Sequence, residues 1–244
     1  MSTPQTRPVA VVTGGTRGIG LGIVRDLAVT HHVVVGGRTP DAVRRVVLEL
    51  PSAQGLVADL ADCAPGGGLE RALGDLAPTL PRVDVLVHSA GILRHGSVAV
   101  APVSDWIDSL TVNVVAVAAV TRALLPALRA AHGIVIAVNS GSGFTSGAQS
   151  GAYSASKFAL RALTDALREE ERANGVRVTS LHPGRVDTDM QHELVGHEGV
   201  DYDAVAYLDV GSVVAAARLA IDAGPRASVD QVSVRPRGWP PTRD

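Results

Sequence analysis

The sequence contains a single lysine among its 22 basic residues, and the other 21 are arginine. Cysteine is equally scarce, since Cys63 stands alone, which excludes a disulfide within the chain and fits a reducing cytoplasm. Aromatic residues make up 3% of the chain, too few to form the stacking platforms that bind single-stranded nucleic acid. The formal net charge of −2 provides no general attraction to nucleic acid or to an anionic membrane.

Long hydrophobic runs are also missing. The longest, Val114–Val120, has seven residues, whereas about 20 are needed to cross a bilayer. The polar segment Met1–Pro8 carries no export signal. We therefore expect a cytoplasmic protein that binds neither membrane nor nucleic acid.

Short runs of β-branched residues recur along the chain and are continuous rather than alternating, which is typical of a parallel sheet covered by helices on both faces. The predicted strands are Val9–Val12, His32–Val35, Gly55–Ala58, Val83–Val87, Ile134–Val138, Val176–Leu181 and Val229–Val234. Helical spacing marks Leu21–Val29, Asp41–Leu50, Val103–Leu128, Ala155–Arg172 and Ser212–Ile221. This alternation predicts one α/β domain over residues 1–244, with a doubly wound, parallel, seven-stranded sheet and right-handed crossovers. Pro65–Gly68 and residues 236–244 are typical of loops, and the latter of a mobile tail.

A glycine-rich segment, Thr13–Gly20, follows the first predicted strand directly and leads into the first predicted helix. Glycines let the backbone turn tightly and approach a pyrophosphate, whose charge then lies at the positive end of a helix with free N–H groups. In this strand-turn-helix setting, the Gly-x3-Gly-x-Gly spacing predicts a dinucleotide site rather than a plain turn. The expected contacts are Gly14, Thr16, Arg17, Gly18, Ile19 and Gly20.

The end of the second predicted strand indicates which dinucleotide binds. An NAD enzyme usually carries an acidic residue there, which bonds the adenosine ribose 2′-hydroxyl. This sequence has Gly36, Gly37 and Arg38 instead. Arg38 and Arg17 could clamp a 2′-phosphate from two sides, so we predict NADP(H) over NAD. The alternative is that one or both arginines are merely exposed.

The only lysine, Lys157, lies four positions after Tyr153 in a stretch with helical spacing. Residues four apart share one face of a helix. An ammonium beside a phenol favours the phenolate and lowers the pKa of the phenol, which turns tyrosine into an acid or base. The alternative is a solvated pair on a surface helix.

In combination and order, Thr13–Gly20 and Tyr153–Lys157 resemble the Thr-Gly-x3-Gly-x-Gly and Tyr-x3-Lys motifs of the short-chain dehydrogenase/reductase family. The resemblance covers nearly the whole chain. It implies a Rossmann fold and hydride transfer between NADP(H) and a small carbonyl compound or secondary alcohol, with Tyr153 as general acid and base. A noncatalytic dinucleotide sensor with the same fold is the alternative.

The resemblance assigns two further catalytic residues. Ser140 lies thirteen residues before Tyr153 and would donate a hydrogen bond to the substrate oxygen, with Ser142 as a nearby rival. Lys157 would also bond the nicotinamide ribose. Asn113 would hold a water that links Lys157 to solvent, or else only satisfy a backbone group.

Further cofactor contacts follow position by position from the resemblance. They are Asp59 and Leu60 near adenine, Ser89, Ala90 and Gly91 beside the ribose, and Pro183, Gly184, Val186 and Thr188 around the nicotinamide carboxamide. His88 and Ser89 stand where the family usually has two asparagines. That departure puts in doubt the side-chain bonds that normally brace the central sheet.

Residues 189–208 correspond to the segment that in the family closes over substrate. The expected pocket residues are Leu93, His95, Ser142, Gln149, Met190, Leu194 and Tyr202, and Arg94 and Arg185 are candidates to contact an acidic group. His192, Glu193 and His197 do not predict a metal site, because the histidines are five apart and no thiolate supports them. The helices predicted at 103–128 and 155–172 are too apolar for one-sided burial, so they are either deep core or face a partner chain. The family commonly pairs these two helices across a dimer axis, so the resemblance implies a homodimer or homotetramer.

Overall fold

The computed structural model describes residues 7–224 and 226–237, and its centre is a parallel sheet of seven strands. The strands are β1 (Val9–Thr13), β2 (His32–Gly37), β3 (Ala53–Val57), β4 (Val85–His88), β5 (Ile134–Val138), β6 (Arg177–Pro183) and β7 (Gln231–Val234). Their order in the sheet is β3-β2-β1-β4-β5-β6-β7. The strand order therefore reverses between β1 and β4, which is where doubly wound sheets bind ligands.

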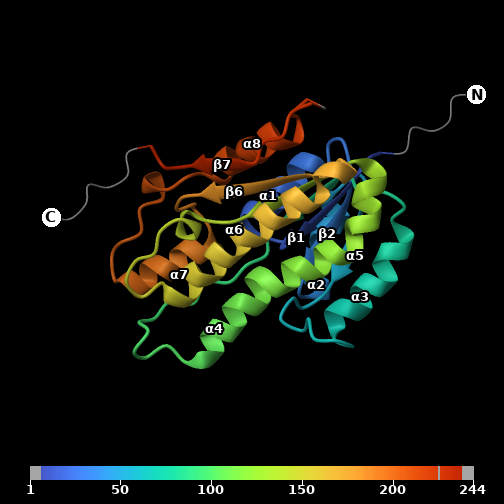
Figure 1. Ribbon diagram of the computed structural model, residues 1–244. Helices are drawn as coiled ribbons and strands as arrows, with labels where there is room; N and C mark the ends of the chain where they lie inside the picture. Colours follow the sequence, from blue (N-terminus) through green and yellow to red (C-terminus); the bar gives the residue numbers. More distant parts are fainter. Residues whose placement is uncertain (1–6, 225, 238–244) are drawn as a thin grey trace, which may run out of the picture.

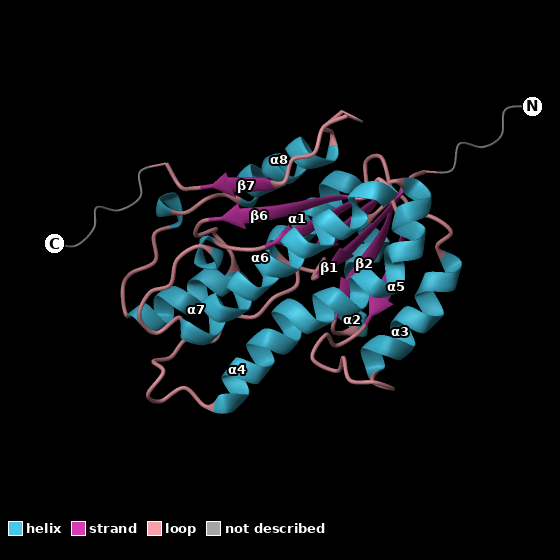
Figure 2. Cartoon of the chain, in the orientation of Figure 1, coloured by secondary structure: helices cyan, strands magenta, loops and turns pink. Residues whose placement is uncertain are grey.

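Helices cover both faces of this sheet (Figures 1 and 2). The helices are α1 (Gly18–Leu27), α2 (Pro40–Glu49), α3 (Gly68–Leu76), α4 (Val103–Leu110), α5 (Ala116–Ala131), α6 (Gly151–Glu171), α7 (Asp189–Glu198) and α8 (Val210–Ile221). Short helical turns are η1 (Ala77–Thr79), η2 (Thr111–Val115), η3 (Gly141–Gly143), η4 (Arg172–Asn174) and η5 (Ala204–Ala206). The predicted doubly wound α/β fold in one domain is confirmed.

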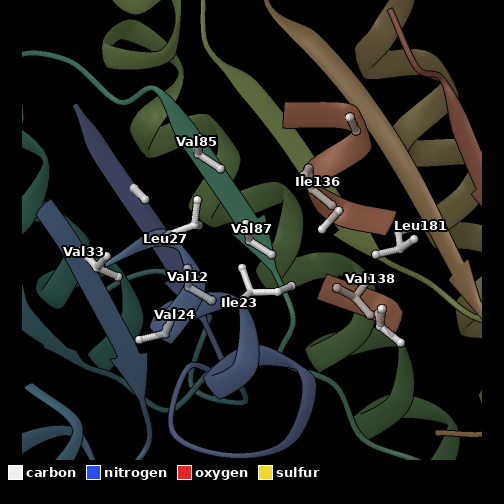
Figure 3. Close-up of a cluster of buried hydrophobic side chains, with 14 of the residues drawn as sticks. Val12, Ile23, Val24, Leu27, Val33, Val85, Val87, Ile136, Val138 and Leu181 are labelled. Atoms are coloured by element: carbon white, nitrogen blue, oxygen red, sulfur yellow. The ribbon is translucent and has the colours of Figure 1, made fainter. Parts of the chain in front are cut away.

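Two apolar clusters hold these layers together because successive strand residues point to opposite faces. Val12 and Val35 belong to one cluster together with buried residues of α1 and α8, and Figure 3 shows Val12 beside Ile23 and Val24. Their neighbours Val11 and Val34 belong to the other cluster, with α3 and α5. Both faces of the central strands are therefore buried, as their continuous apolar runs predicted.

The edges of the sheet depart from that prediction. Only Leu56 of β3 is buried, and β7 alternates between exposed and half-buried residues. A strand with one neighbour cannot be covered as fully as a central one. Gly68 was also expected in a loop but begins α3, whose Leu69 and Leu73 pack into the core. Pro236 is buried and lies close to Gly184, while residues 238–244 of the expected tail lie outside the described residues.

The helix predicted over 103–128 is not regular. It consists of α4 and α5 joined by the π-turn η2, and together they run from Val103 to Ala131. By length and composition alone this is the one described helix that could cross a membrane. Leu124 and Leu128, however, are fully buried against the sheet, so it has the place of a core helix.

Candidate active site

The glycine-rich turn forms the first part of the site, at the carboxyl end of β1. Gly14 adopts a φ of +66°, and a Cβ on it would stand 2.7 Å from the Ala90 backbone, so only glycine fits there. No side chain caps the N-terminus of α1, and its first turn contains no acidic residue. The first amides of a helix lack intrahelical acceptors. The described residues thus leave an uncapped, positively polarised helix end that suits a phosphate group.

The two arginines of the predicted phosphate clamp differ in their contacts. Arg38 is exposed, and none of the described side chains pairs with it. Arg17 pairs with Asp189 at 3.2 Å, and both side chains are largely exposed. Thr16 links the two regions, because a Cβ on Gly37 would be 2.7 Å from its methyl group. Arg17 therefore reaches toward α7 and would have to turn to join Arg38.

The next two cofactor segments follow β3 and β4. Asp59 is exposed and accepts a hydrogen bond from the Ala61 amide at 3.0 Å, so its carboxylate caps the turn after β3. Leu60 packs against the core. The Ser89 amide donates to the Thr13 carbonyl at 3.2 Å, which brings Ser89 and Ala90 onto the glycine turn. These segments thus border the same edge of the sheet.

His88 supplies a side-chain hydrogen bond at the end of β4, where the absence of the two asparagines had put such bonds in doubt. Its Nε2 lies 2.9 Å from the Thr121 hydroxyl of α5. Burial lowers the pKa of His88 to about 4, so the ring is neutral at physiological pH. The histidine therefore ties β4 to α5 without introducing a charge.

Tyr153 and Lys157 lie on one face of α6, as the spacing predicted. The Lys157 ammonium is 5.7 Å from the centre of the Tyr153 ring and donates a hydrogen bond to the Val138 carbonyl at 3.0 Å. Lys157 is only 5% exposed, and burial lowers its pKa to about 8. The alternative of a solvated surface pair is therefore wrong.

The expected direction of the tyrosine pKa was also wrong. Burial raises the pKa of the Tyr153 phenol, and the neighbouring Ser140 hydroxyl only partly opposes this rise. The ammonium does not offset it, because Lys157 bonds a backbone carbonyl and lies beside the ring rather than at the phenol oxygen. In this structure Tyr153 is accordingly a protonated acid at neutral pH.

Ser140 lies two residues beyond the end of β5 and caps the N-terminus of η3. Its Oγ accepts a hydrogen bond from the Ser142 amide at 3.1 Å, so its own O–H remains free to donate. Ser142 contributes its backbone to this arrangement. The structure brings Ser140, rather than Ser142, to the Tyr153 phenol.

Asn113 is buried inside the π-turn η2. Its Oδ1 accepts from the Ile92 amide at 2.9 Å, and its Nδ2 donates to the Ile92 carbonyl at 3.0 Å and to Ser156 Oγ at 2.9 Å. A Cβ on Gly91 would stand 3.2 Å from Asn113 Oδ1 and 3.8 Å from Lys157 Nζ. Asn113 thus lies near the lysine, but its side chain mainly holds the backbone after β4.

The segment Pro183–Thr188 borders the site beside the glycine turn. The Gly184 amide donates to the Val234 carbonyl at 2.7 Å, and Val186 is buried. A Cβ on Gly18 would be 3.4 Å from the Thr188 methyl group, so the segment reaches the N-terminus of α1. The two predicted cofactor segments are therefore neighbours.

Residues 189–208 form α7 and η5, with several contacts to the rest of the site. His197 stacks on His95 at 5.6 Å between ring centres, and the Tyr202 hydroxyl donates to Asp187 at 2.6 Å. His192 stacks on Tyr202 at 3.6 Å. Within the described residues, no three His, Cys, Asp or Glu side chains gather as metal ligands.

Both arginines considered for an acidic substrate have partners of their own. Arg94 pairs with Asp108 at 3.1 Å, and Arg185 pairs with Glu198 at 2.5 Å. Each guanidinium is therefore neutralised by a neighbouring carboxylate. An acidic substrate would have to displace one of these pairs.

Comparisons with known proteins agree with this architecture. A sequence model described as short chain dehydrogenase matches residues 8–199. An uncharacterized oxidoreductase of Staphylococcus saprophyticus is 31% identical, over 93% of this chain and 97% of that protein. A variant of actinorhodin polyketide ketoreductase solved with NADPH is 27% identical, with a TM-score of 0.87 over 98% of this chain and 99% of that one. A metagenomic short-chain oxidoreductase solved with NADP is 28% identical, with a TM-score of 0.79 over 95% and 98%. Sequence and fold together show that this chain belongs to the short-chain dehydrogenase/reductase family of oxidoreductases.

Proposed function

We propose that this protein transfers a hydride between NADP(H) and a small carbonyl compound or the matching secondary alcohol, with Tyr153 as general acid and base. One observation carries the proposal. The side chains of Ser140, Tyr153 and Lys157 meet at the carboxyl edge of the sheet, where the uncapped N-terminus of α1 also lies. A proton donor, a hydrogen-bond donor and a phosphate-binding helix end are the parts that such a reaction requires.

The residues present fit the dinucleotide. The backbone of Thr13–Gly20 would hold the pyrophosphate, Asp59 and Leu60 the adenine end, and Pro183–Thr188 the carboxamide. When bound, the nicotinamide supplies or accepts the hydride. Lys157 would bond the ribose hydroxyls, and its pKa of about 8 keeps most of its charge at neutral pH.

The hydroxyl groups have separate roles in carbonyl reduction. Ser140 accepts from the Ser142 amide, and so presents its own hydrogen to the substrate oxygen as negative charge develops there. Tyr153 then delivers a proton to that oxygen. Burial raises the pKa of Tyr153, so the phenol holds this proton at neutral pH until the substrate oxygen receives it.

The preference for NADP(H) rests on charge at the end of β2. Arg38 is exposed there, none of the described acidic side chains pairs with it, and Arg17 lies in the adjoining glycine turn. Two structural relatives were solved with NADP or NADPH, which supports the same assignment. We further propose a cytoplasmic homodimer or homotetramer, because apolar side chains on α4, η2 and α6 remain exposed, including Val103, Ile107, Val115 and Phe158.

The test is NADPH oxidation measured against a panel of aldehydes, ketones and β-ketoacyl thioesters. Turnover is expected in the wild type and should fall by a factor of about 10² to 10⁴ in Tyr153→Phe, the usual contribution of general acid catalysis. Ser228→Ala is the control, because it removes an exposed hydroxyl just before β7, outside this group. NADPH binding without turnover on any substrate, unchanged in Tyr153→Phe, would instead identify a dinucleotide sensor.

A further inference from the structure

His182 is a buried histidine at the carboxyl end of β6 to which the proposed hydride transfer gives no task. Its side chain is 0% exposed, and the Phe144 ring packs against it at 4.2 Å between centres. It directly precedes Pro183 and Gly184, which begin the proposed carboxamide-binding segment. His182 therefore lies between the turn that contains Ser140 and Phe144 and the Pro183–Thr188 segment.

The ring makes one hydrogen bond, and that bond reaches the catalytic serine. Nδ1 lies 2.9 Å from the backbone carbonyl oxygen of Ser140. Because a carbonyl only accepts, Nδ1 carries the proton and Nε2 presents a bare lone pair. Nε2 is buried and has no partner among residues 7–224 and 226–237.

The ring is also kept neutral. Burial lowers the pKa of His182, and the positive charges of Arg161, Arg235 and Lys157 act in the same direction against the Ser140 hydrogen bond. A neutral ring with an unsatisfied buried acceptor is costly compared with an apolar side chain of similar size. The bond to Ser140 is the one evident compensation for that cost.

The hydrogen bond between His182 and Ser140 lies just beyond the last backbone pairing of β5 with β6. The last paired residues of β5 and β6 are Val138 and Leu181, and the Asn139 amide makes the final backbone bond, to Leu181. β5 ends at Val138, whereas β6 continues to Pro183. The His182 ring then continues the connection from β6 to Ser140.

Other contacts make His182 a firm anchor. Arg235 donates to the His182 carbonyl at 2.9 Å, which ties the residue to the chain after β7. The Ser140 carbonyl also accepts from the Gly143 amide at 3.0 Å, but Gly143 belongs to the same turn and moves with it. Of these two donors, only His182 fixes the serine relative to another strand.

We propose that His182 is a positioning residue, which holds the Ser140 hydroxyl in alignment with the Pro183–Thr188 segment through the Ser140 carbonyl. This inference rests on the proposed function, since it assigns Ser140 and that segment to one reaction. Misplacing a donor by a fraction of an ångström weakens transition-state stabilisation while leaving most of the cofactor contacts intact.

The test compares His182→Asn with His182→Leu, because the two side chains have the same heavy-atom skeleton and only asparagine can donate from an atom bonded to Cγ. Steady-state kinetics should show kcat reduced about tenfold or more in His182→Leu and about threefold or less in His182→Asn. The NADPH dissociation constant, from cofactor fluorescence, should stay within about twofold of wild type in both. Equal kcat values for the two variants would overturn the proposal.

A double-mutant cycle shows whether the effect passes through Ser140. In a Ser140→Ala background, His182→Leu should cause no additional loss of kcat, because the group it positions is gone. Full additivity would show that His182 acts elsewhere. If the wild type turns over and His182→Leu is equally active, only this inference is overturned. If the wild type shows no turnover on the whole panel, the proposed function is overturned as well.

A measurement on the unaltered protein covers the case in which His182→Leu does not fold. Nitrogen-15 spectra of histidine-labelled wild-type protein should show the His182 ring neutral and protonated at Nδ1 near neutral pH. A ring protonated at Nε2 would mean that the bond to Ser140 does not form, and the proposal would fail.

Discussion

The Lys157 ammonium donates its hydrogen bond to the backbone carbonyl of Val138, 3.0 Å away, at the last residue of β5. The only lysine of the chain is thus anchored to the strand that leads into Ser140, and it lies 5.7 Å from the centre of the Tyr153 ring. This contact fixes the ammonium between the tyrosine and the proposed ribose position. Its charge and its shape can therefore be tested separately.

Lys157→Arg keeps the charge but replaces a compact ammonium with a broad planar fork. The site is nearly closed to solvent, so the guanidinium cannot take the same place beside Tyr153 and Val138. We expect kcat for carbonyl reduction to fall about 100-fold or more, measured as NADPH oxidation. Arg172→Lys, at an exposed residue of η4, is the control and should leave kcat unchanged. Near-normal turnover in Lys157→Arg would mean that charge alone suffices.

Lys157→Met should gain stability relative to wild type at neutral pH, although it removes activity. The pKa of Lys157 falls from 10.5 to about 8 on folding, so below pH 8 the folded protein carries a charge that burial disfavours. Between about pH 8 and 10.5 the unfolded chain binds the proton and the folded chain does not, so wild-type stability rises with pH.

The advantage of Lys157→Met should therefore shrink as the pH rises through this range, by at most about 3 kcal/mol. The difference in free energy of unfolding between the two proteins is measured by urea unfolding at roughly pH 7.5, 9 and 10. A stability difference that does not change with pH would contradict the lowered pKa of Lys157.

Gly14→Ala should impair both folding and NADPH binding. The new methyl group would stand 2.7 Å from the Ala90 backbone, and φ at this residue is +66°. A destabilisation of about 1 to 3 kcal/mol is expected, with a weaker NADPH affinity, because the turn must move. Gly74→Ala is the matched control, since a Cβ there meets nothing within 4 Å inside α3 and should stabilise by up to about 1 kcal/mol. Unfolding curves and NADPH titrations that fail to separate the two variants would refute the close packing of Gly14 on Ala90.

The sequence predicted most of the fold because its signals are local. Continuous apolar runs located the central strands, and β5 was placed at its observed bounds, Ile134–Val138. The π-turn at Thr111–Val115 could not be predicted, because it depends on Asn113 bonding the Ile92 backbone, 21 residues earlier. A contact between residues so far apart in the sequence produces no periodic pattern in it.

The same limit applies to the candidate site. Spacing located Ser140, Tyr153 and Lys157, but the pKa of Tyr153 depends on how deeply the folded chain buries it. His182 was missed altogether. Its task is visible only once the pairing of β5 with β6 brings its ring to the Ser140 carbonyl.

Arg38→Ala should shift cofactor preference. If Arg38 contacts the 2′-phosphate, losing a charge-assisted contact of about 1.5 to 3 kcal/mol lowers kcat/KM for NADPH by roughly 10- to 150-fold. The kcat/KM for NADH, which lacks that phosphate, should hardly change. Asp189→Ala provides a second arm, because it releases Arg17 and should preserve or strengthen the preference for NADPH. Equal losses with both cofactors, or a wild type that prefers NADH, would refute the assignment.

Ile107→Asp should separate the proposed oligomer into monomers. Ile107 is 57% exposed and Val103, one turn earlier on α4, is 73% exposed, so this face has little to lose within a monomer. Figure 1 shows α4, α5 and α6 on the same side of the sheet, where a second copy could cover them. A carboxylate buried between two subunits without a partner would cost several kcal/mol, enough to dissociate them at micromolar concentration.

The measurement for Ile107→Asp is light scattering after size-exclusion chromatography. Leu48→Asp on α2 is the control, since Leu48 is 75% exposed but lies away from α4, α5 and α6. It should leave the oligomer intact, and neither substitution should alter the circular dichroism spectrum. A wild type that is already monomeric, or an Ile107→Asp variant that keeps the wild-type mass, would show that this apolar face does not join two copies of the chain.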